Sequence, residues 1–367
     1  MIPPVRLLLG LFLLWVTSIR AENWITYEAK PGPGQGKHLV FLTGDEEYRS
    51  EEGLPMLAKI LSQRHGFKCT VLFAVAPDGT INPRYNKSVP GAEALDTADG
   101  IVMLLRFRQW PDEPMKHFMD AVARGVPIIG LRTATHAFRF PTNSTSPYAK
   151  FSDKAPESFG EKVFGEEWVN HWGPNRRGAT RGVLEPSALD DPILRGVSDI
   201  FGDTGVYEVY PPADVKILVR GLVLKGMNPT DEPADTNVVR RGVGYPINQP
   251  AMPVAWTRLN QNPSGKVNKV FCTTMGAATD LQSEGLRRLI VNAAYWGQGL
   301  EIPAKADVTY VDDYHPTAYL DNGHRRGITP ADHAIGKVLT AGTPAPAPAP
   351  RAGAAAPATT PPAQAPR

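Results

Sequence analysis

The sequence predicts an α/β fold in which a mostly parallel sheet is covered by helices on both faces. The first observation is a series of short apolar runs, each about the length of a buried strand. The second is that segments with helical spacing of apolar residues separate several of these runs. Strands that alternate with helices form a parallel sheet. The strands predicted in the first half of the chain are residues 38–43, 68–74, 100–105 and 126–131.

The elements of the first half follow in a regular order. The first strand, residues 38–43 (HLVFLT), ends at Gly44. Apolar residues then recur at helical spacing over 54–61, and Gly66 ends this predicted helix. A second helix is predicted over 114–124, where apolar residues again follow the helical period. Each of these two helices lies between two predicted strands, as a parallel sheet requires.

The second half of the chain is less regular. A long loop region rich in Gly, Pro and aromatic residues is expected at 139–178, and a final helix at 284–295. We expect one domain over 36–300 and an extension over 301–340 packed on its surface. Further strands are predicted around Val183 and at 206–209, 215–223, 253–257 and 270–274. The charged residues of the extension are interpreted as surface packing: Asp312, Asp313, His315, His324, Arg325 and Arg326.

Both ends of the chain differ from the rest. Residues 1–21 combine Arg6, an apolar run of about ten residues and a final Ala21, which is typical of a secretory signal peptide. The run is half of the roughly 20 residues that a spanning helix needs; the alternative is an uncleaved anchor. Residues 341–367, rich in Ala and Pro, predict a disordered tail. We therefore expect an exported protein, periplasmic or extracellular, without a stable membrane span after signal cleavage.

Charge and cysteine content exclude several classes of function. The formal net charge is +2, with Lys and Arg spread along the chain, so nucleic-acid binding is not supported. Cys69 and Cys272 are the only cysteines, and each lies in a strand-like run. They either form a disulfide, as an exported protein permits, or remain two buried thiols in neighbouring strands. Two cysteines without a CxxC motif do not make a metal site. No feature of the sequence indicates an oligomeric state.

Polar residues follow several of the predicted strands. Because ligands of open parallel sheets bind beyond the carboxyl ends of the strands, these residues are the candidates for a site. Histidine can act as a general base or as a metal ligand, and an aromatic ring can stack on a sugar. The candidates for catalysis are His136, His171 and Glu47. The candidates for ligand contacts are Arg49, Arg106, Arg108, Arg132, Thr133, Trp172, Asn175, Tyr207 and Asp280.

The turn after the fourth predicted strand gives the most information about the chemistry of the site. Residues 126–138 (VPIIGLRTATHAF) have the strand, tight turn and helix that are typical of a nucleophile elbow. Arg132 stands at the position of the nucleophile, and a guanidinium cannot attack a carbonyl, which excludes thiol chemistry at this turn. The helix N-terminus favours an anion there, and Arg132 could add to this effect. Alternatively, Arg132 pairs with an acid such as Glu47 and holds the turns together.

Six segments, taken in their order, resemble the ThuA-like (trehalose-utilisation) proteins of the class I glutamine amidotransferase-like superfamily. They are GDEEYRSEE, GLRTATHAF, HWGPN, DTGVYEVYP, PVAWTR and VFCTTMGAATD. The resemblance covers about residues 36–300 and implies a flavodoxin-like sheet without the catalytic cysteine. It also implies a small carbohydrate ligand, such as a disaccharide or an oxidised (3-keto) sugar. Some of these proteins have two histidines at the elbow, whereas here only His136 matches and Arg132 takes the other place.

Two functions remain open from the sequence. The first is an enzyme that acts on a carbohydrate by acid–base chemistry, as a lyase, an isomerase or a hydrolase. The second is a non-catalytic carbohydrate-binding or scaffold protein. A glutaminase is excluded by Arg132. No cofactor is predicted; the alternative is a divalent metal such as zinc, held by the two histidines and a carboxylate such as Asp280 or Glu47.

Overall fold

The computed structural model describes residues 22–339. The predicted signal peptide at 1–21 and the predicted tail at 341–367 lie outside the described residues. Between residues 22 and 339, no helix is both long enough and apolar enough to cross a bilayer.

The described chain is built around one sheet of ten strands in the order β1-β3-β2-β4-β5-β14-β13-β10-β7-β8. The five strands from β3 to β14 run parallel to their neighbours, and the other pairs are antiparallel. This confirms the predicted α/β class. The bounds are β1 (Trp24–Tyr27), β2 (His38–Gly44), β3 (Lys68–Leu72), β4 (Gly100–Leu105), β5 (Ile128–Leu131), β7 (Thr180–Leu184), β8 (Phe201–Gly202), β10 (Val215–Val223), β13 (Met252–Gln261) and β14 (Val267–Thr273).

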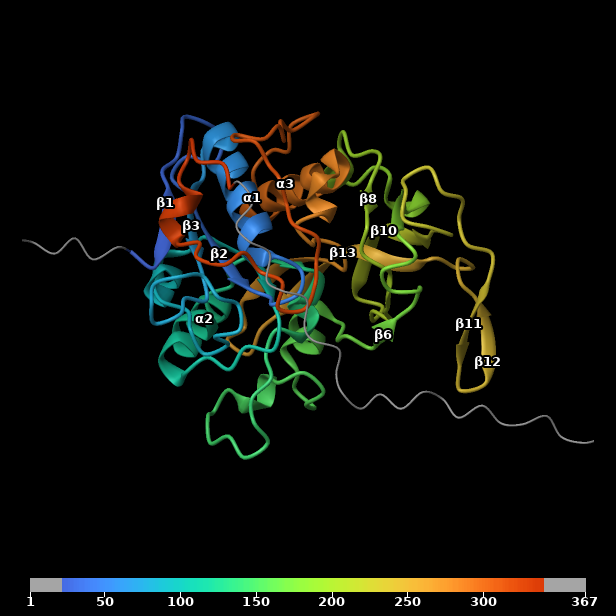
Figure 1. Cartoon of the computed structure of the whole chain (residues 1–367), viewed down its shortest axis with the longest axis horizontal. Coiled ribbons are helices and arrows are strands. Elements are labelled where there is room, and N and C mark those ends of the chain that lie inside the picture. Colours follow the sequence, from blue (N-terminus) through green and yellow to red (C-terminus); the bar gives the residue numbers. More distant parts are fainter. Residues whose placement is uncertain (1–21, 340–367) are drawn as a thin grey trace, which may run out of the picture.

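Three α-helices pack against this sheet. They are α1 (Ser50–His65), α2 (Asp112–Ala123) and α3 (Glu284–Gln298). Gly66 ends α1 with φ of 80°, a left-handed conformation that glycine adopts without strain. In Figure 1, α1 and α3 lie side by side above the parallel strands, while α2 lies below them. The hydrogen bond between His65 Nδ1 and Tyr295 Oη, at 2.8 Å, joins α1 to α3.

Short elements complete the fold. A two-stranded hairpin, which the sequence pattern did not predict, projects from the antiparallel end of the sheet in Figure 1. The short strands are β6 (Asn170–His171), β9 (Tyr207–Glu208), β11 (Asn237–Arg240) and β12 (Val243–Pro246), of which β11 and β12 form this hairpin. The single-turn helices are η1 (Ala92–Thr97), η2 (Arg132–His136), η3 (Ala149–Phe151), η4 (Gly160–Phe164), η5 (Pro186–Ala188), η6 (Pro192–Leu194), η7 (Asp280–Gln282) and η8 (Pro330–His333).

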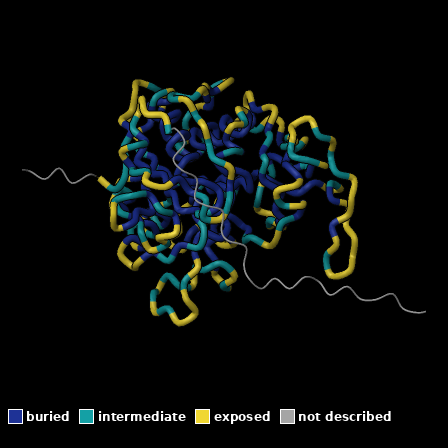
Figure 2. The backbone as a smooth tube through the Cα atoms, viewed as in Figure 1, coloured by how far each residue is buried: buried dark blue, intermediate teal, exposed yellow. Residues whose placement is uncertain are grey.

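The core lies along the parallel strands, which are apolar on both faces because helices cover them. Val40, Phe41 and Leu42 of β2 are fully buried, as are Val102 and Met103 of β4. Figure 2 shows the same distribution, with buried residues in the centre and exposed ones in the outer loops. This packing fixes the carboxyl ends of β2, β4, β5 and β14 at one edge of the sheet.

The two cysteines do not lie in neighbouring strands. Cys69 belongs to β3 and Cys272 to β14, and both are buried free thiols. Three strands separate them in the sheet. Because neighbouring strands lie about 4.8 Å apart, four such spacings place the two residues roughly 19 Å from each other. A disulfide needs Cα atoms within about 7 Å, so the disulfide alternative is wrong. The other alternative is correct in that both cysteines are buried thiols, but their strands are not neighbours.

The segment after α3 is part of the buried structure and not only a surface layer. Glu52 of α1 accepts hydrogen bonds from Thr317, at 2.7 Å from its backbone N–H and 2.6 Å from its hydroxyl. Glu52 also accepts a hydrogen bond from Arg325 Nε at 3.2 Å, and both side chains are buried. His324 is buried as well. The interpretation of His324 and Arg325 as surface packing is therefore wrong, because both are buried and Arg325 docks on α1 through Glu52.

We expect the buried histidine His333 of η8 to lower the stability of the folded protein in acid. Its ring is buried and stacks on Phe73, with centroids 5.2 Å apart. Burial, and then the positive charge of Lys59, lower its pKa to about 3. As pH falls below the ordinary value of about 6.5, the unfolded chain takes up a proton first, and the folded state loses stability until its own pKa is reached.

We expect His333→Phe to remove this loss. Between pH 6 and pH 4, the unfolding free energy of the wild type should fall relative to the variant by about 1.4 kcal/mol per pH unit. Urea unfolding at each pH measures the difference, and groups common to both proteins cancel. His117→Gln is the control, and its effect should have the opposite sign, because hydrogen bonding to Asp96 raises the pKa of half-buried His117. Parallel pH curves for the wild type and His333→Phe would contradict the prediction.

Candidate functional site

The turn after β2 is held by Asp45, a residue that sequence reasoning did not select. One of its carboxylate oxygens accepts hydrogen bonds from the backbone N–H groups of Glu47, at 2.6 Å, and Tyr48, at 2.7 Å. Its other oxygen accepts a hydrogen bond from the Thr133 hydroxyl at the start of η2. Asp45 thus fixes the turn after β2 against the elbow after β5. Its position directly after an apolar strand was the available signal, since an aspartate there can accept from N–H groups two and three residues on.

Arg132 lies at the elbow with φ of 43°, in the left-handed region that a nucleophile elbow requires. Its Nη1 donates to the carbonyl oxygens of Gly205, at 2.8 Å, and Thr274, at 2.6 Å. The guanidinium lies over the Tyr207 ring, 3.9 Å from the centroid, and over the Tyr48 ring at 4.6 Å. Arg132 is therefore neither paired with Glu47 nor open to a ligand. It is a buried cation that joins three turns.

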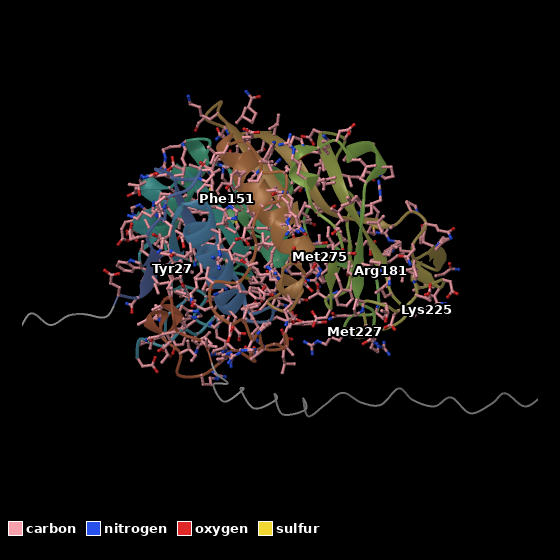
Figure 3. All side chains as sticks on the ribbon, turned by 90° about the horizontal axis from the view of Figure 1, so that it is seen from above. Tyr27, Phe151, Arg181, Lys225, Met227 and Met275 are labelled. Carbon is pink, nitrogen blue, oxygen red and sulfur yellow. The ribbon has the colours of Figure 1, made fainter. Side chains whose placement is uncertain are left out.

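The elbow also contacts the end of β14. The backbone N–H of Arg132 donates to the carbonyl oxygen of Met275 at 3.1 Å. Met275, labelled in Figure 3, lies near the middle of the molecule, where α3 borders the antiparallel strands that carry Arg181. The carboxyl ends of β2, β5 and β14 consequently meet through hydrogen bonds, as expected for the binding edge of a parallel sheet.

Arg106, at the end of β4, is the centre of a charged cluster. Its Nη1 lies 2.8 Å from Glu46 Oε1, 3.3 Å from Glu47 Oε2 and 3.3 Å from Asp321 Oδ1. Glu47 also pairs with Arg176, at 3.3 Å. Burial raises the pKa of both glutamates, that of Glu46 to about 7. Glu46, Arg176 and Asp321 were missed because they come from three segments whose proximity no local pattern reveals.

The two candidate histidines approach the same aromatic pair. The His136 ring centroid lies 5.7 Å from that of Trp168 and 6.3 Å from that of Tyr207. The corresponding distances for His171 are 6.1 Å and 5.4 Å. His171 reaches this place because β6 pairs with β9, where His171 lies opposite Tyr207. Two histidines 35 positions apart in the sequence thus belong to one cluster.

Both histidines are neutral at pH 7. Burial lowers the pKa of His136 well below its ordinary value, and the charges of Arg106 and Arg132 lower it further. Burial, and then the charges of Arg132 and Arg106, lower the pKa of His171 to about 4. His171 Nδ1 is buried without a hydrogen-bond partner among the described residues. A neutral imidazole can accept a proton, and nearby guanidinium groups favour negative charge on a neighbouring ligand.

Several predicted ligand contacts are taken up by the protein itself. Each of these side chains is buried and bonds to a neighbouring segment, so its position does not fit the predicted role. Arg49 donates to Leu320 O, Arg108 to Pro83 O at 2.7 Å, Trp172 Nε1 to Ile247 O at 2.7 Å, and Thr133 to Asp45, while Asp280 accepts from Thr204 and the Tyr207 ring is covered by Arg132. His136, His171, Glu47, Arg106 and half-buried Asn175 remain as candidates.

A surface hollow of about 810 Å³ lies beside the loop after β3. Arg84, Tyr85 and Lys87 contribute to its lining. The same loop is tied to the end of β4, since Arg108 donates to Pro83 O and the backbone N–H of Gln109 donates to Asn86 O at 2.9 Å. The hollow is large enough for a disaccharide-sized ligand, but its lining includes none of His136, His171, Glu47 and Arg106.

The predicted zinc alternative does not fit this arrangement. Within residues 22–339, no three His, Cys, Asp or Glu side chains come together in a way that could hold a metal ion. Asp280 is fully buried and accepts hydrogen bonds from its own loop, and Glu47 is shared by Arg106 and Arg176. No step is therefore assigned to a metal.

No family model matches this chain, and no curated protein matches it. Among solved structures, it is similar to a ThuA-like protein from Parabacteroides merdae, with 14% identity and a TM-score of 0.45, over 78% of this chain and 98% of that one. A ThuA-like protein from Bacteroides uniformis has 16% identity and a TM-score of 0.41, over 74% and 94%. A glutamine amidotransferase from Methylobacillus flagellatus has 12% identity and a TM-score of 0.33, over 73% and 96%.

The structure is thus similar to ThuA-like and glutamine amidotransferase-like proteins. Each of these TM-scores is below 0.5, so the likeness carries no statement about activity.

Proposed function

We propose that this protein acts on a small carbohydrate, an oxidised (3-keto) sugar or a disaccharide that contains one, by acid–base chemistry at the carboxyl ends of β2, β4 and β5. The observation that carries the proposal is the pair of neutral imidazoles of His136 and His171 around Trp168 and Tyr207. The proposal includes export to the periplasm or the cell exterior, as residues 1–21 predict.

The charges around the histidines favour one class of reaction. An imidazole can remove a proton from the carbon next to a carbonyl, whereupon the electron pair of the C–H bond moves to the carbonyl oxygen. Arg106 and Arg132 lie close enough to lower the pKa of both histidines. Their positive field stabilises the negative oxygen that forms. The same field opposes the oxocarbenium ion of glycoside hydrolysis. Lyase or isomerase chemistry on a keto sugar is therefore favoured over hydrolysis.

Glu47 has a positioning role in this scheme. Its carboxylate links Arg106 to Arg176 at 3.3 Å on each side. Arg106 is only partly covered, with 20% of its side chain exposed. It can therefore contact a ligand oxygen while Glu46 and Glu47 hold its guanidinium in place.

Non-catalytic binding of the same ligand class is the second candidate. The burial of His136, which is 5% exposed, favours it, because a ligand must displace covering groups to reach the imidazole. The aromatic rings and arginines would suffice to bind a sugar without turnover.

We expect His136→Gln to lower the turnover of a 3-keto disaccharide by about 10²–10⁴-fold, the usual contribution of a positioned general base. Product formation by NMR measures the effect, and a thermal-shift assay reports ligand binding separately. The matched control is His117→Gln, since His117 lies on α2 and pairs with Asp96 and Glu113 at the surface. Its turnover should equal that of the wild type.

The two candidate functions give different results in this experiment. A sugar that stabilises the wild type without any turnover, and stabilises His136→Gln equally, would leave only the binding protein. The absence of both stabilisation and turnover with keto and ordinary disaccharides would overturn the carbohydrate ligand itself.

A further inference from the structure

The imidazole of His171 is held in place without hydrogen bonds to its ring. In the part of the chain that the structure describes, His171 forms hydrogen bonds through its backbone: its N–H donates to Asn170 Oδ1 at 2.8 Å, and its carbonyl oxygen accepts from Arg240 Nη2 at 2.6 Å. A working histidine is commonly oriented by a hydrogen bond to one ring nitrogen. The direction of this ring therefore depends on its backbone and on packing against Trp168 and Tyr207.

The backbone that carries His171 is a very short strand. β6 and β9 have two residues each, and they form a separate sheet with each other. Even a longer isolated pair of strands is at best marginally stable in water. The pairing that places His171 opposite Tyr207 therefore needs support from side chains outside the two strands.

Arg240, at the end of β11, joins the two strands. Its Nη2 donates to the carbonyl oxygen of His171 on β6, and its Nε donates to Glu208 Oε2 on β9, each at 2.6 Å. The Glu208 side chain is 7% exposed, and its other oxygen accepts from the Tyr210 hydroxyl at 2.8 Å. The Arg240 guanidinium also lies over the Trp172 ring, 5.5 Å from its centroid. One planar guanidinium thus fixes β6 against β9 at the position of His171.

The β11–β12 hairpin keeps Arg240 at this place. Arg240 precedes a turn of two residues, Arg241 and Gly242, whose φ angles of 51° and 79° are typical of a tight hairpin turn. At the base of the hairpin, Asn248 bonds to the end of β10: its Oδ1 accepts from the Val223 N–H at 2.9 Å, and its Nδ2 donates to Val223 O at 3.0 Å. The hairpin is therefore anchored to the large sheet at one end and to the strand of His171 near the other.

We propose that Arg240 is a positioning residue of this site, which sets the direction of the His171 imidazole through the backbone of β6. The inference rests on the proposed function, in which His171 is one of the two imidazoles that can accept a proton. Without the guanidinium, β6 can shift on β9, and a displacement of about 1 Å can cost on the order of 10²-fold in rate. The hairpin is thus part of the site, although Arg240 itself does not touch the reacting atoms.

The test compares Arg240→Gln and Arg240→Lys in the full chain. Glutamine removes the charge and the two parallel donors, whereas lysine keeps the charge but places it on a single nitrogen. Arg220 of β10 is the matched control, because it also pairs with a glutamate, Glu185, and donates to a backbone carbonyl, Ala251 O at 2.9 Å. Its side chain is 31% exposed, against 28% for Arg240. Arg220→Gln and Arg220→Lys therefore remove the same kinds of contact away from His171.

NMR of the histidine rings in the ligand-free protein reports where the imidazole lies, because the neighbouring aromatic rings shift its signals, and His171→Gln assigns them. Steady-state kinetics with the 3-keto disaccharide separate kcat from KM. We expect the His171 signals to move in both Arg240 variants while those of His117 stay, and both Arg220 variants to give the wild-type spectrum. We expect kcat to fall about 10–10²-fold in both Arg240 variants, with little change in KM.

The outcomes separate this inference from the proposed function. Unchanged His171 signals in Arg240→Gln would overturn the positioning role. Wild-type signals and kcat in Arg240→Lys would show that a positive charge suffices, which overturns the bridge between the strands. An equal loss of kcat in Arg220→Gln would assign the effect to stability and not to position. If the wild type shows no turnover, the proposed function and the kinetic role of Arg240 fall together, while the NMR comparison still decides whether Arg240 holds the imidazole.

Discussion

Replacing Glu52 with alanine is expected to lower the free energy of unfolding by about 3–5 kcal/mol, the usual cost of removing one partner of a buried ion pair. Glu52 is 5% exposed and so is Arg325, which donates to it at 3.2 Å. The variant leaves the Arg325 guanidinium without its carboxylate and the Thr317 N–H without its acceptor. Each group would remain buried without its partner, and neither regains water without opening the structure.

The effect should extend to the candidate site. The segment held by Glu52 continues to Leu320, whose backbone oxygen accepts from Arg49, and to Asp321, which pairs with Arg106. Urea unfolding measures the stability, and limited proteolysis within 311–339 reports detachment of the segment. Glu113→Ala on α2, whose side chain is 77% exposed, is the matched control and should change stability by less than about 0.5 kcal/mol. A loss below about 1 kcal/mol for Glu52→Ala would show that the segment does not depend on this carboxylate.

Arg132→Ala is expected to destabilise the fold by a similar amount, about 3–5 kcal/mol. The change empties the space between the Tyr48 and Tyr207 rings and leaves the carbonyl oxygens of Gly205 and Thr274 without their donor. Arg132→Lys should recover only part of the loss, because an ammonium group cannot stack on both rings and reach both carbonyls in the same way. Urea unfolding of the wild type and of both variants measures the differences in the free energy of unfolding.

Arg139 provides the control for charge alone. It follows the same elbow and pairs with Asp153, but half of its side chain is exposed, at 49%. Arg139→Ala removes a half-exposed guanidinium and should therefore cost less than Arg132→Ala, although Asp153, whose side chain is 3% exposed, loses its partner. Equal losses for the two arginines would mean that the buried contacts of Arg132 contribute nothing beyond its charge.

The helices and the parallel strands were predictable because their signals are local. An apolar run such as 100–105 is buried on both faces wherever it lies in a parallel sheet, and β4 covers the same residues, Gly100–Leu105. Gly66 ended the first helix as expected. Among the antiparallel strands, β10 has the predicted bounds, 215–223, whereas β13 continues past the predicted 253–257 to Gln261. The last four residues of β13 are half-buried or exposed and left no apolar run in the sequence. The β11–β12 hairpin has mostly exposed or half-buried residues and left no core signal.

The sequence predicted where the candidate site lies, but it did not predict the role of each residue there. Polar residues after β2, β4 and β5 do meet at one edge, as the topology requires. However, an arginine in the sequence has the same donors whether it binds a ligand or a backbone carbonyl. Arg106 and Arg108 are two residues apart, yet Arg106 faces a charged, partly exposed cluster while Arg108 is buried against Pro83 O.

Local patterns therefore decide that this chain forms an α/β sheet and that its polar turns gather at the carboxyl ends of the strands. They act through backbone geometry and the burial of apolar surface, and both depend on residues that are close together in the sequence. The tertiary structure alone decides which charged groups are buried, paired or free to meet a ligand. Burial and partner charges set the protonation of His136 and His171, and these depend on residues that only folding brings together.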